Sequence, residues 1–180
     1  MLTRDETVLL IIDVQGKLAR LVHDSEALVK NISKLVRACR ILGVPVLYTE
    51  QYPKGLGVTV DSIRELLVEE APFEKVSFSC CGAEGFMQHL RTINRNEIIV
   101  TGIESHVCVY QTSVELIEYG YNVHLITDAV SSRSRDNRDI GIHCIETAGA
   151  WVKSTEMVIF ELLKIAEGEQ FKAISSIIKE

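Results

Sequence analysis

The stretch TGIESHVCVYQTSVELIEYG, from Thr101 to Gly120, places a cysteine where a predicted strand changes into a predicted helix. The apolar run NEIIV comes directly before it, and apolar positions then recur at helical spacing up to Gly120. Cys108 therefore lies at a strand-to-helix corner. Backbone N–H groups at the start of a helix favour a thiolate and can also bind a developing oxyanion. A small buried core residue is an equally good interpretation of Cys108 from its position alone.

Strand and helix patterns alternate on both sides of this corner. The predicted strands are nearly continuous apolar runs, as a parallel sheet covered on both faces requires. We therefore predict an α/β fold, a doubly wound and mostly parallel sheet in three α/β/α layers, formed by one domain over residues 1–180. Residues 50–81 are predicted to be a loop with a short helix near 60–69. The predicted strands are 7–13, 44–49, 97–102, 122–128 and 156–161, and the predicted helices are 25–42, 83–94, 107–120 and 138–151.

Composition and charge exclude several classes of protein. The 180 residues are 47% hydrophobic with a net charge of −6, and Arg alternates with Asp in the one dense charge run, SSRSRDNRD. A nucleic-acid partner is not expected, because phosphate contacts need a clustered basic surface. No apolar run approaches the roughly 18 residues of a membrane span, and the N-terminus lacks signal-peptide features. Five cysteines without zinc-type spacing suit reduced thiols, so we expect a cytoplasmic protein without a membrane partner.

Ligands of open α/β sheets bind beyond the carboxyl ends of the strands. Asp13 follows the apolar run LLII at such an end, where a carboxylate is costly to desolvate unless it is paired or used. A turn or helix cap is the alternative interpretation of Asp13. Lys75 lies in the aromatic stretch FEKVSFS, and its position alone favours an ordinary surface lysine. His106 is poorly spaced to act as a base for Cys108, because helical residues i and i+2 point apart.

Four motifs in this order resemble the isochorismatase-like cysteine hydrolases, the superfamily that also contains nicotinamidases and N-carbamoylsarcosine amidohydrolases. The motifs are LLIIDVQGKL, FEKVSFS, VTGIESHVCVYQTSVEL and LITDAVSSR, and the resemblance covers nearly the whole chain. It implies a six-stranded sheet and a catalytic triad of Asp13, Lys75 and Cys108. In that triad the aspartate would carry the thiol proton to a leaving amine, while the lysine would favour both carboxylate and thiolate.

The resemblance also implies the surroundings of the triad. Backbone N–H groups of Glu104 and Cys108 would form the oxyanion hole, with a cis peptide bond between Ile103 and Glu104. The residues expected to line the substrate pocket are Gln51, Ile103 and His106.

Two departures from the family narrow the expected chemistry. Nicotinamidases place a metal-binding Asp-x-His after the second strand, where this chain has Thr49 and Gln51. We therefore expect no metal and no cofactor. Isochorismatase itself lacks the nucleophilic cysteine, so Cys108 favours acyl chemistry. These features predict a metal-independent cysteine hydrolase that cleaves a small amide, ureido or carbamoyl C–N bond through a thioester.

A different class of function remains open at this point, a non-catalytic scaffold that acts through oligomeric assembly. A phospho-receiver is disfavoured, because the third predicted strand ends in Thr101–Gly102 rather than in an acceptor aspartate. We also expect a homo-oligomer. The C-terminal FKAISSIIKE is amphipathic, and its isoleucines at 174, 177 and 178 need cover.

Overall fold

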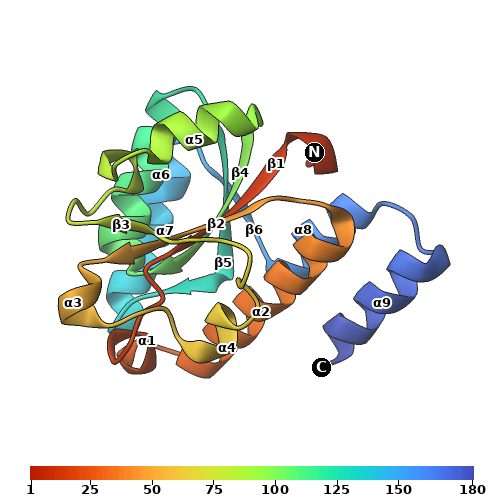
Figure 1. Ribbon diagram of the computed structural model, residues 1–180, viewed down its shortest axis with the longest axis horizontal. Helices are drawn as coiled ribbons and strands as arrows, with labels where there is room; N and C mark the ends of the chain where they lie inside the picture. Colours follow the sequence, from red (N-terminus) through yellow and green to blue (C-terminus); the bar gives the residue numbers. More distant parts are fainter.

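A computed structural model describes residues 1–180, and its centre is a six-stranded sheet (Figure 1). The strand order is β3-β2-β1-β4-β5-β6, and every neighbouring pair is parallel. The predicted α/β fold and its doubly wound sheet are confirmed. The strands are β1 (Thr7–Ile12), β2 (Val46–Gln51), β3 (Phe73–Lys75), β4 (Glu97–Ile103), β5 (Asn122–Ser131) and β6 (Trp151–Lys153).

Helices cover both faces of this sheet, with α5, α6 and α7 on one side and α2 and α8 on the other (Figure 1). The α-helices are α1 (Leu18–Leu21), α2 (Ser25–Leu42), α3 (Pro53–Leu56), α4 (Asp61–Arg64), α5 (Phe86–Ile93), α6 (Tyr110–Glu118), α7 (Arg135–Thr147), α8 (Thr155–Leu163) and α9 (Gly168–Lys179). Short 3₁₀ turns form η1 (Arg4–Glu6) and η2 (Cys80–Gly82), and η3 (Ser105–Val109) is a π-helical turn.

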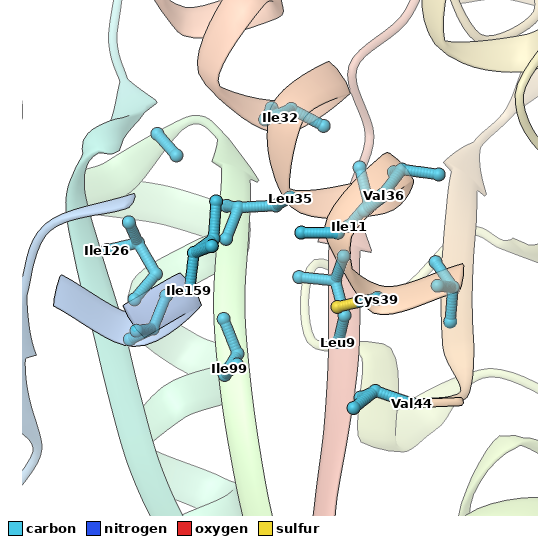
Figure 2. Close-up of a cluster of buried hydrophobic side chains, with 14 of the residues drawn as sticks. Leu9, Ile11, Ile32, Leu35, Val36, Cys39, Val44, Ile99, Ile126 and Ile159 are labelled. Atoms are coloured by element: carbon cyan, nitrogen blue, oxygen red, sulfur yellow. The ribbon is translucent and has the colours of Figure 1, made fainter. Parts of the chain in front are cut away.

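Each central strand is buried on both faces, which explains its continuous apolar run. Along β1, Leu9 and Ile11 pack against α2 and α8, whereas the residues between them pack towards α5 and α6. Figure 2 shows the first of these clusters, where Leu35 and Val36 of α2 contact the sheet. Full burial of each such side chain contributes about 1.5–3 kcal/mol. The central sheet is therefore the rigid support for whatever its strand ends carry.

The prediction of a strand at 156–161 is wrong, because these residues form helix α8. The side chain of Ser154 caps this helix by accepting from Met157 N–H, and the Asp128 carboxylate accepts from Thr155 N–H at 2.8 Å. Its buried face follows helical spacing, with Val158 and Leu162 four residues apart. The true last strand is β6, which lies where the predicted helix 138–151 was expected to end. Strand β3 likewise lies inside the predicted loop.

The C-terminal helix α9 packs against α2 of its own chain (Figure 1). Ile174 and Ile177 are buried there, and Arg37 of α2 pairs with the carboxylate of Glu180. The expectation that these isoleucines need a partner chain is therefore wrong, because α2 already covers them. None of the helices combines the length and the apolarity that crossing a membrane demands.

Candidate active site

Three of the predicted residues lie at the carboxyl edge of the sheet, each at the end of a different strand. Asp13 follows β1, Lys75 is the last residue of β3, and Cys108 lies in η3 directly after β4. They are 4%, 5% and 7% exposed, respectively. A cavity of about 400 Å³ is lined by Lys75, Tyr52 and Glu74, whereas cavities of about 540 and 600 Å³ elsewhere in the molecule contain none of the three. An enclosed cluster of this kind suits a small substrate better than a polymer.

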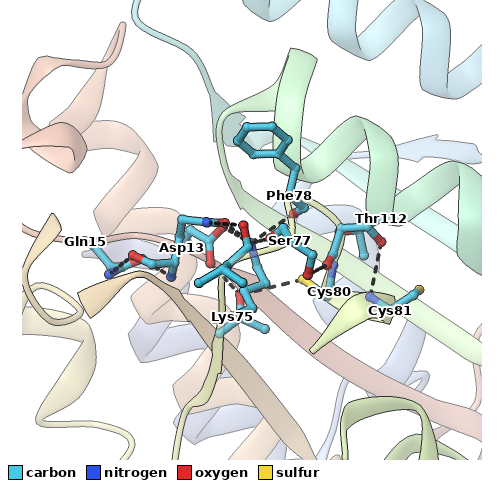
Figure 3. A network of polar contacts seen from close by, with 12 residues as sticks. Asp13, Gln15, Lys75, Ser77, Phe78, Cys80, Cys81 and Thr112 are labelled. Atoms are coloured by element: carbon cyan, nitrogen blue, oxygen red, sulfur yellow. Dashed lines mark hydrogen bonds and ion pairs between the residues drawn. The ribbon is translucent and has the colours of Figure 1, made fainter. Parts of the chain in front are cut away.

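Asp13 and Lys75 form a buried ion pair (Figure 3). The distance from Lys75 Nζ to Asp13 Oδ2 is 2.6 Å, and the lysine side chain is fully buried. The same ammonium donates to Gln51 Oε1 at 2.8 Å and to the carbonyl oxygens of Phe78 and Ser77 at 2.9 and 3.2 Å. Buried charges persist in proteins when they are paired and fully hydrogen-bonded, as this lysine is. The interpretation of Lys75 as an ordinary surface lysine is wrong.

Gln51 holds the lysine rather than presenting a free amide. Its Oε1 accepts from Lys75, and its Nε2 donates to the Val76 carbonyl at 2.9 Å. Both ends of the amide are therefore occupied by the protein, and contact with substrate stays a prediction. The backbone N–H of Gln51 donates to Gln15 Oε1 at 2.6 Å, while Gln15 Nε2 donates to the carbonyls of Gln51 and Gly57. Gln15 thus fixes the end of β2 that carries Gln51.

Sequence reasoning missed Gln15 and the role of Thr49. The Thr49 hydroxyl donates to Asp13 Oδ1 at 2.7 Å, so both carboxylate oxygens of Asp13 accept a hydrogen bond. The sequence did carry two signals of these roles, a polar residue two positions after Asp13 and the polar residues at the end of β2. Only the strand register shows that these residues lie together. Ile12 pairs with Thr49 across β1 and β2.

Close backbone packing builds the corner that carries Cys108. Gly102 has φ +116°, and a Cβ there would lie 2.1 Å from the Ile12 carbonyl oxygen. Gly141 of α7 packs against η3, because a Cβ there would lie 2.6 Å from the Ser105 carbonyl carbon. Both positions therefore require glycine. The π-helical turn that follows β4 is a rare local structure that is often found at functional sites.

The electrostatics of Cys108 differ from the sequence-based expectation. Burial and the Asp13 negative charge raise the pKa of Cys108 to about 12, and the Lys75 ammonium offsets only part of this rise. A hydrogen bond to the Asp13 carboxylate also favours the protonated thiol. Lys75 lowers this pKa as expected, but burial and Asp13 outweigh it, so the expectation of a net lowered pKa is wrong. Since the thiol is protonated at neutral pH, it needs a base to become a nucleophile, and Asp13 lies beside it.

The lead-in residues of the corner have separate roles. The Ile103–Glu104 peptide bond is cis, as expected. The Glu104 N–H donates no hydrogen bond within the chain, whereas the Glu104 carboxylate accepts from both Arg133 N–H and Arg133 Nε at 3.0 Å. His106 Nδ1 lies 3.0 Å from Ser132 Oγ. Ile103 is fully buried in the core and offers no surface to a ligand. The burial of Ile103 therefore does not support its predicted place in the substrate pocket.

The residues at the expected metal position do not fit a metal ion. Thr49 and Gln51 already bind Asp13 and Lys75 through their side chains. No group of three or more His, Cys, Asp or Glu side chains is arranged to hold a metal ion. The site is a hydrogen-bonded ion pair beside a neutral thiol.

Comparison with known proteins places this chain in a family. The isochorismatase domain model matches residues 7–157. The secreted isochorismatase effector Isc1 of Phytophthora sojae is 39% identical, over 97% of this chain and 85% of the relative. The structure of MAR1 ribonuclease from Caenorhabditis elegans is 37% identical with a TM-score of 0.93, covering 99% of this chain and 92% of that one.

A more distant structure shares only the fold. YcaC from Escherichia coli, described as an octameric hydrolase of unknown specificity, is 20% identical with a TM-score of 0.92, covering 98% of this chain and 88% of that one. Its fold and those of the nearer relatives agree with the parallel sheet described above. From the domain match and the similarity along nearly its whole length, the chain belongs to the isochorismatase family.

Proposed function

We propose that the protein is a metal-independent cysteine hydrolase that cleaves a small amide, ureido or carbamoyl C–N bond through a thioester. The observation that carries this proposal is the convergence of Asp13, Lys75 and Cys108 at one sheet edge, with a protonated thiol beside an ion-paired carboxylate. Family membership supports a hydrolase. The identity of the nucleophile and the bond that is cleaved are our inference.

The first half of the reaction forms the thioester. The Cys108 sulfur attacks the carbonyl carbon of the substrate as Asp13 takes the thiol proton. The carbonyl oxygen becomes an oxyanion, which the unpaired Glu104 N–H and the Cys108 N–H would stabilise. When the intermediate collapses, the C–N bond breaks and Asp13 gives its proton to the leaving nitrogen. Lys75 keeps the carboxylate ion-paired and in place throughout.

The second half releases the acid. Water attacks the thioester carbon while Asp13 accepts one of its protons, and the C–S bond then breaks. The departing sulfur takes the proton back, so the thiol and the carboxylate are regenerated. The same carboxylate therefore carries both protons: the thiol proton goes to the leaving nitrogen, and a proton from water goes to the departing sulfur.

The name of the nematode relative raises a second activity, RNA cleavage. The charge and the enclosure of the site argue against it here. The chain carries a net charge of −6, and the three proposed catalytic residues are at most 7% exposed. A polynucleotide would need a basic track and an open groove at the reacting groups. We therefore expect no RNA cleavage that depends on Cys108.

A turnover screen tests the proposed function. Small aliphatic amides, ureides, carbamoyl amino acids and a structured RNA are incubated with the wild-type protein, and released ammonia, amine or cleaved RNA is measured. We expect hydrolysis of at least one C–N substrate, unchanged by prior dialysis against a chelator. Hydrolysis that is lost after chelation would contradict metal independence, and no turnover of any compound would favour the non-catalytic scaffold.

Self-association is part of the same proposal, although its surface differs from the one expected. Trp151 of the edge strand β6 is 63% exposed, and Met157 and Phe160 of α8 are also exposed. Large exposed apolar side chains are typical of interfaces between subunits. We expect light scattering at micromolar concentration to give a multiple of 20.1 kDa. A mass of 20.1 kDa would contradict this.

A further inference from the structure

The Thr49 hydroxyl is buried between two other side chains of the site. Thr49 is 1% exposed, and its Oγ1 lies 2.7 Å from Asp13 Oδ1 and 3.6 Å from Cys80 Sγ. Cys80 is itself fully buried at the start of η2. All three side chains are buried. The orientation of the hydroxyl is therefore set by these two neighbours.

The chemistry of these neighbours determines where the hydroxyl proton points. A hydroxyl has one proton to donate and can accept two. An ionised carboxylate only accepts, and its other oxygen already takes the Lys75 ammonium. The Thr49 proton therefore goes to Asp13 Oδ1, and the Thr49 oxygen accepts from the Cys80 thiol. Lys75 therefore donates to one oxygen of the Asp13 carboxylate, and Thr49 donates to the other.

We propose that Thr49 is a positioning residue that orients the Asp13 carboxylate towards Cys108. This inference rests on the proposed function, in which Asp13 takes the Cys108 proton. The hydroxyl donates to one oxygen of the carboxylate, while Lys75 donates to the other. Losing the Thr49 donor would free the carboxylate to rotate about its remaining contact with Lys75.

Few other titratable groups lie close enough to Asp13 to affect its orientation. Lys75 from β3, Cys80 from η2 and Cys108 from η3 are the titratable groups that face Asp13. The neighbouring carboxylate of Glu50 points elsewhere, since it accepts from Thr59 N–H and Thr59 Oγ1 at 2.6 and 2.8 Å. A change confined to the Thr49 hydroxyl therefore tests one contact of Asp13.

The test follows alkylation of Cys108 by iodoacetamide at pH 7, measured on the Cys108 peptide by mass spectrometry. In the wild type we expect Asp13 to take the thiol proton as the sulfur attacks the reagent. In Thr49→Val we expect the alkylation rate to fall by roughly 10- to 100-fold, the size expected for the loss of one hydrogen bond to a charged group.

Two further variants separate the hydroxyl from packing. Thr101→Val removes a hydroxyl of equal burial, which donates to the Leu10 carbonyl at 3.1 Å and does not contact Asp13. Its alkylation rate should match the wild type. Thr49→Ser keeps the hydroxyl and should also keep the wild-type rate, even if the valine variant folds poorly. An unchanged rate in Thr49→Val, or an equal fall in Thr49→Ser, would overturn the proposal.

This readout is independent of turnover. If no amide is hydrolysed but the alkylation rate of Thr49→Val falls as expected, the Thr49 inference stands and the proposed function fails. If amides are hydrolysed and the alkylation rate of Thr49→Val is unchanged, the Thr49 inference fails alone.

Discussion

Replacing Cys108 by alanine is expected to lower kcat/KM for the hydrolysed amide by at least about 10³-fold, because the variant has no atom that can form the thioester. The rest of the site should remain, since the Asp13–Lys75 ion pair and its hydrogen bonds do not depend on the sulfur. The measurement is steady-state kinetics on the best substrate of the screen, with thermal unfolding as a check of folding.

A matched control separates nucleophile loss from packing loss. Cys39→Ala removes another buried thiol from the other hydrophobic cluster, on the far side of the sheet. It should lose stability comparable to Cys108→Ala and keep near wild-type kcat/KM. If Cys108→Ala retains activity within about tenfold of the wild type, which is far less than the expected loss, the thiol is not the nucleophile.

The second large loss of catalytic rate is expected for Asp13→Asn. The amide cannot take the thiol proton, and Cys108, with its pKa raised to about 12 chiefly by burial, cannot ionise by itself at neutral pH. General-base removal typically costs 10²–10⁴-fold in rate, and we expect a loss in this range. The same kinetic assay measures it.

Stability must be followed in the same variant, because Asp13 is half of a buried ion pair. Removing one partner of such a pair typically costs about 3–5 kcal/mol. Lys75 keeps three neutral acceptors, the Gln51 side chain and the carbonyls of Ser77 and Phe78, which should hold the cost near the lower value. Asp128→Asn serves as control, since Asp128 caps α8 away from the ion pair. Full activity in a folded Asp13→Asn protein would remove Asp13 from the mechanism.

The parallel sheet could be predicted because its strands are buried on both faces and show it as uninterrupted apolar runs. Helix α2 was predicted with its observed bounds, since its apolar stripe ends at Gly43 in a left-handed conformation. The run 156–161 was wrongly predicted to be a strand, because a short run rich in apolar residues fits a buried strand and a buried helix equally well. Its helical state depends on a cap from Asp128, a residue 27 positions earlier, which pattern analysis cannot connect.

The candidate triad could be proposed from sequence because Asp13, Lys75 and Cys108 each lie in a motif with a family resemblance. Their hydrogen-bond partners could not, because Thr49 reaches Asp13 through the register of β1 and β2, and the carbonyls that hold Lys75 come from an irregular turn. The sign of the thiol pKa shift was missed for a related reason. Burial of Cys108 exceeds the effect of the nearby cation, and burial depends on packing from distant elements such as Gly141.

The most direct test of the central claim is to trap the covalent intermediate. Wild-type protein is mixed with the best substrate, quenched in acid within milliseconds to seconds, and analysed by intact-protein and peptide mass spectrometry. The account predicts an added mass equal to the acyl part of the substrate, located on Cys108 and absent from Cys108→Ala. Rapid hydrolysis with no adduct at any quench time, together with retained turnover in Cys108→Ala, would contradict it.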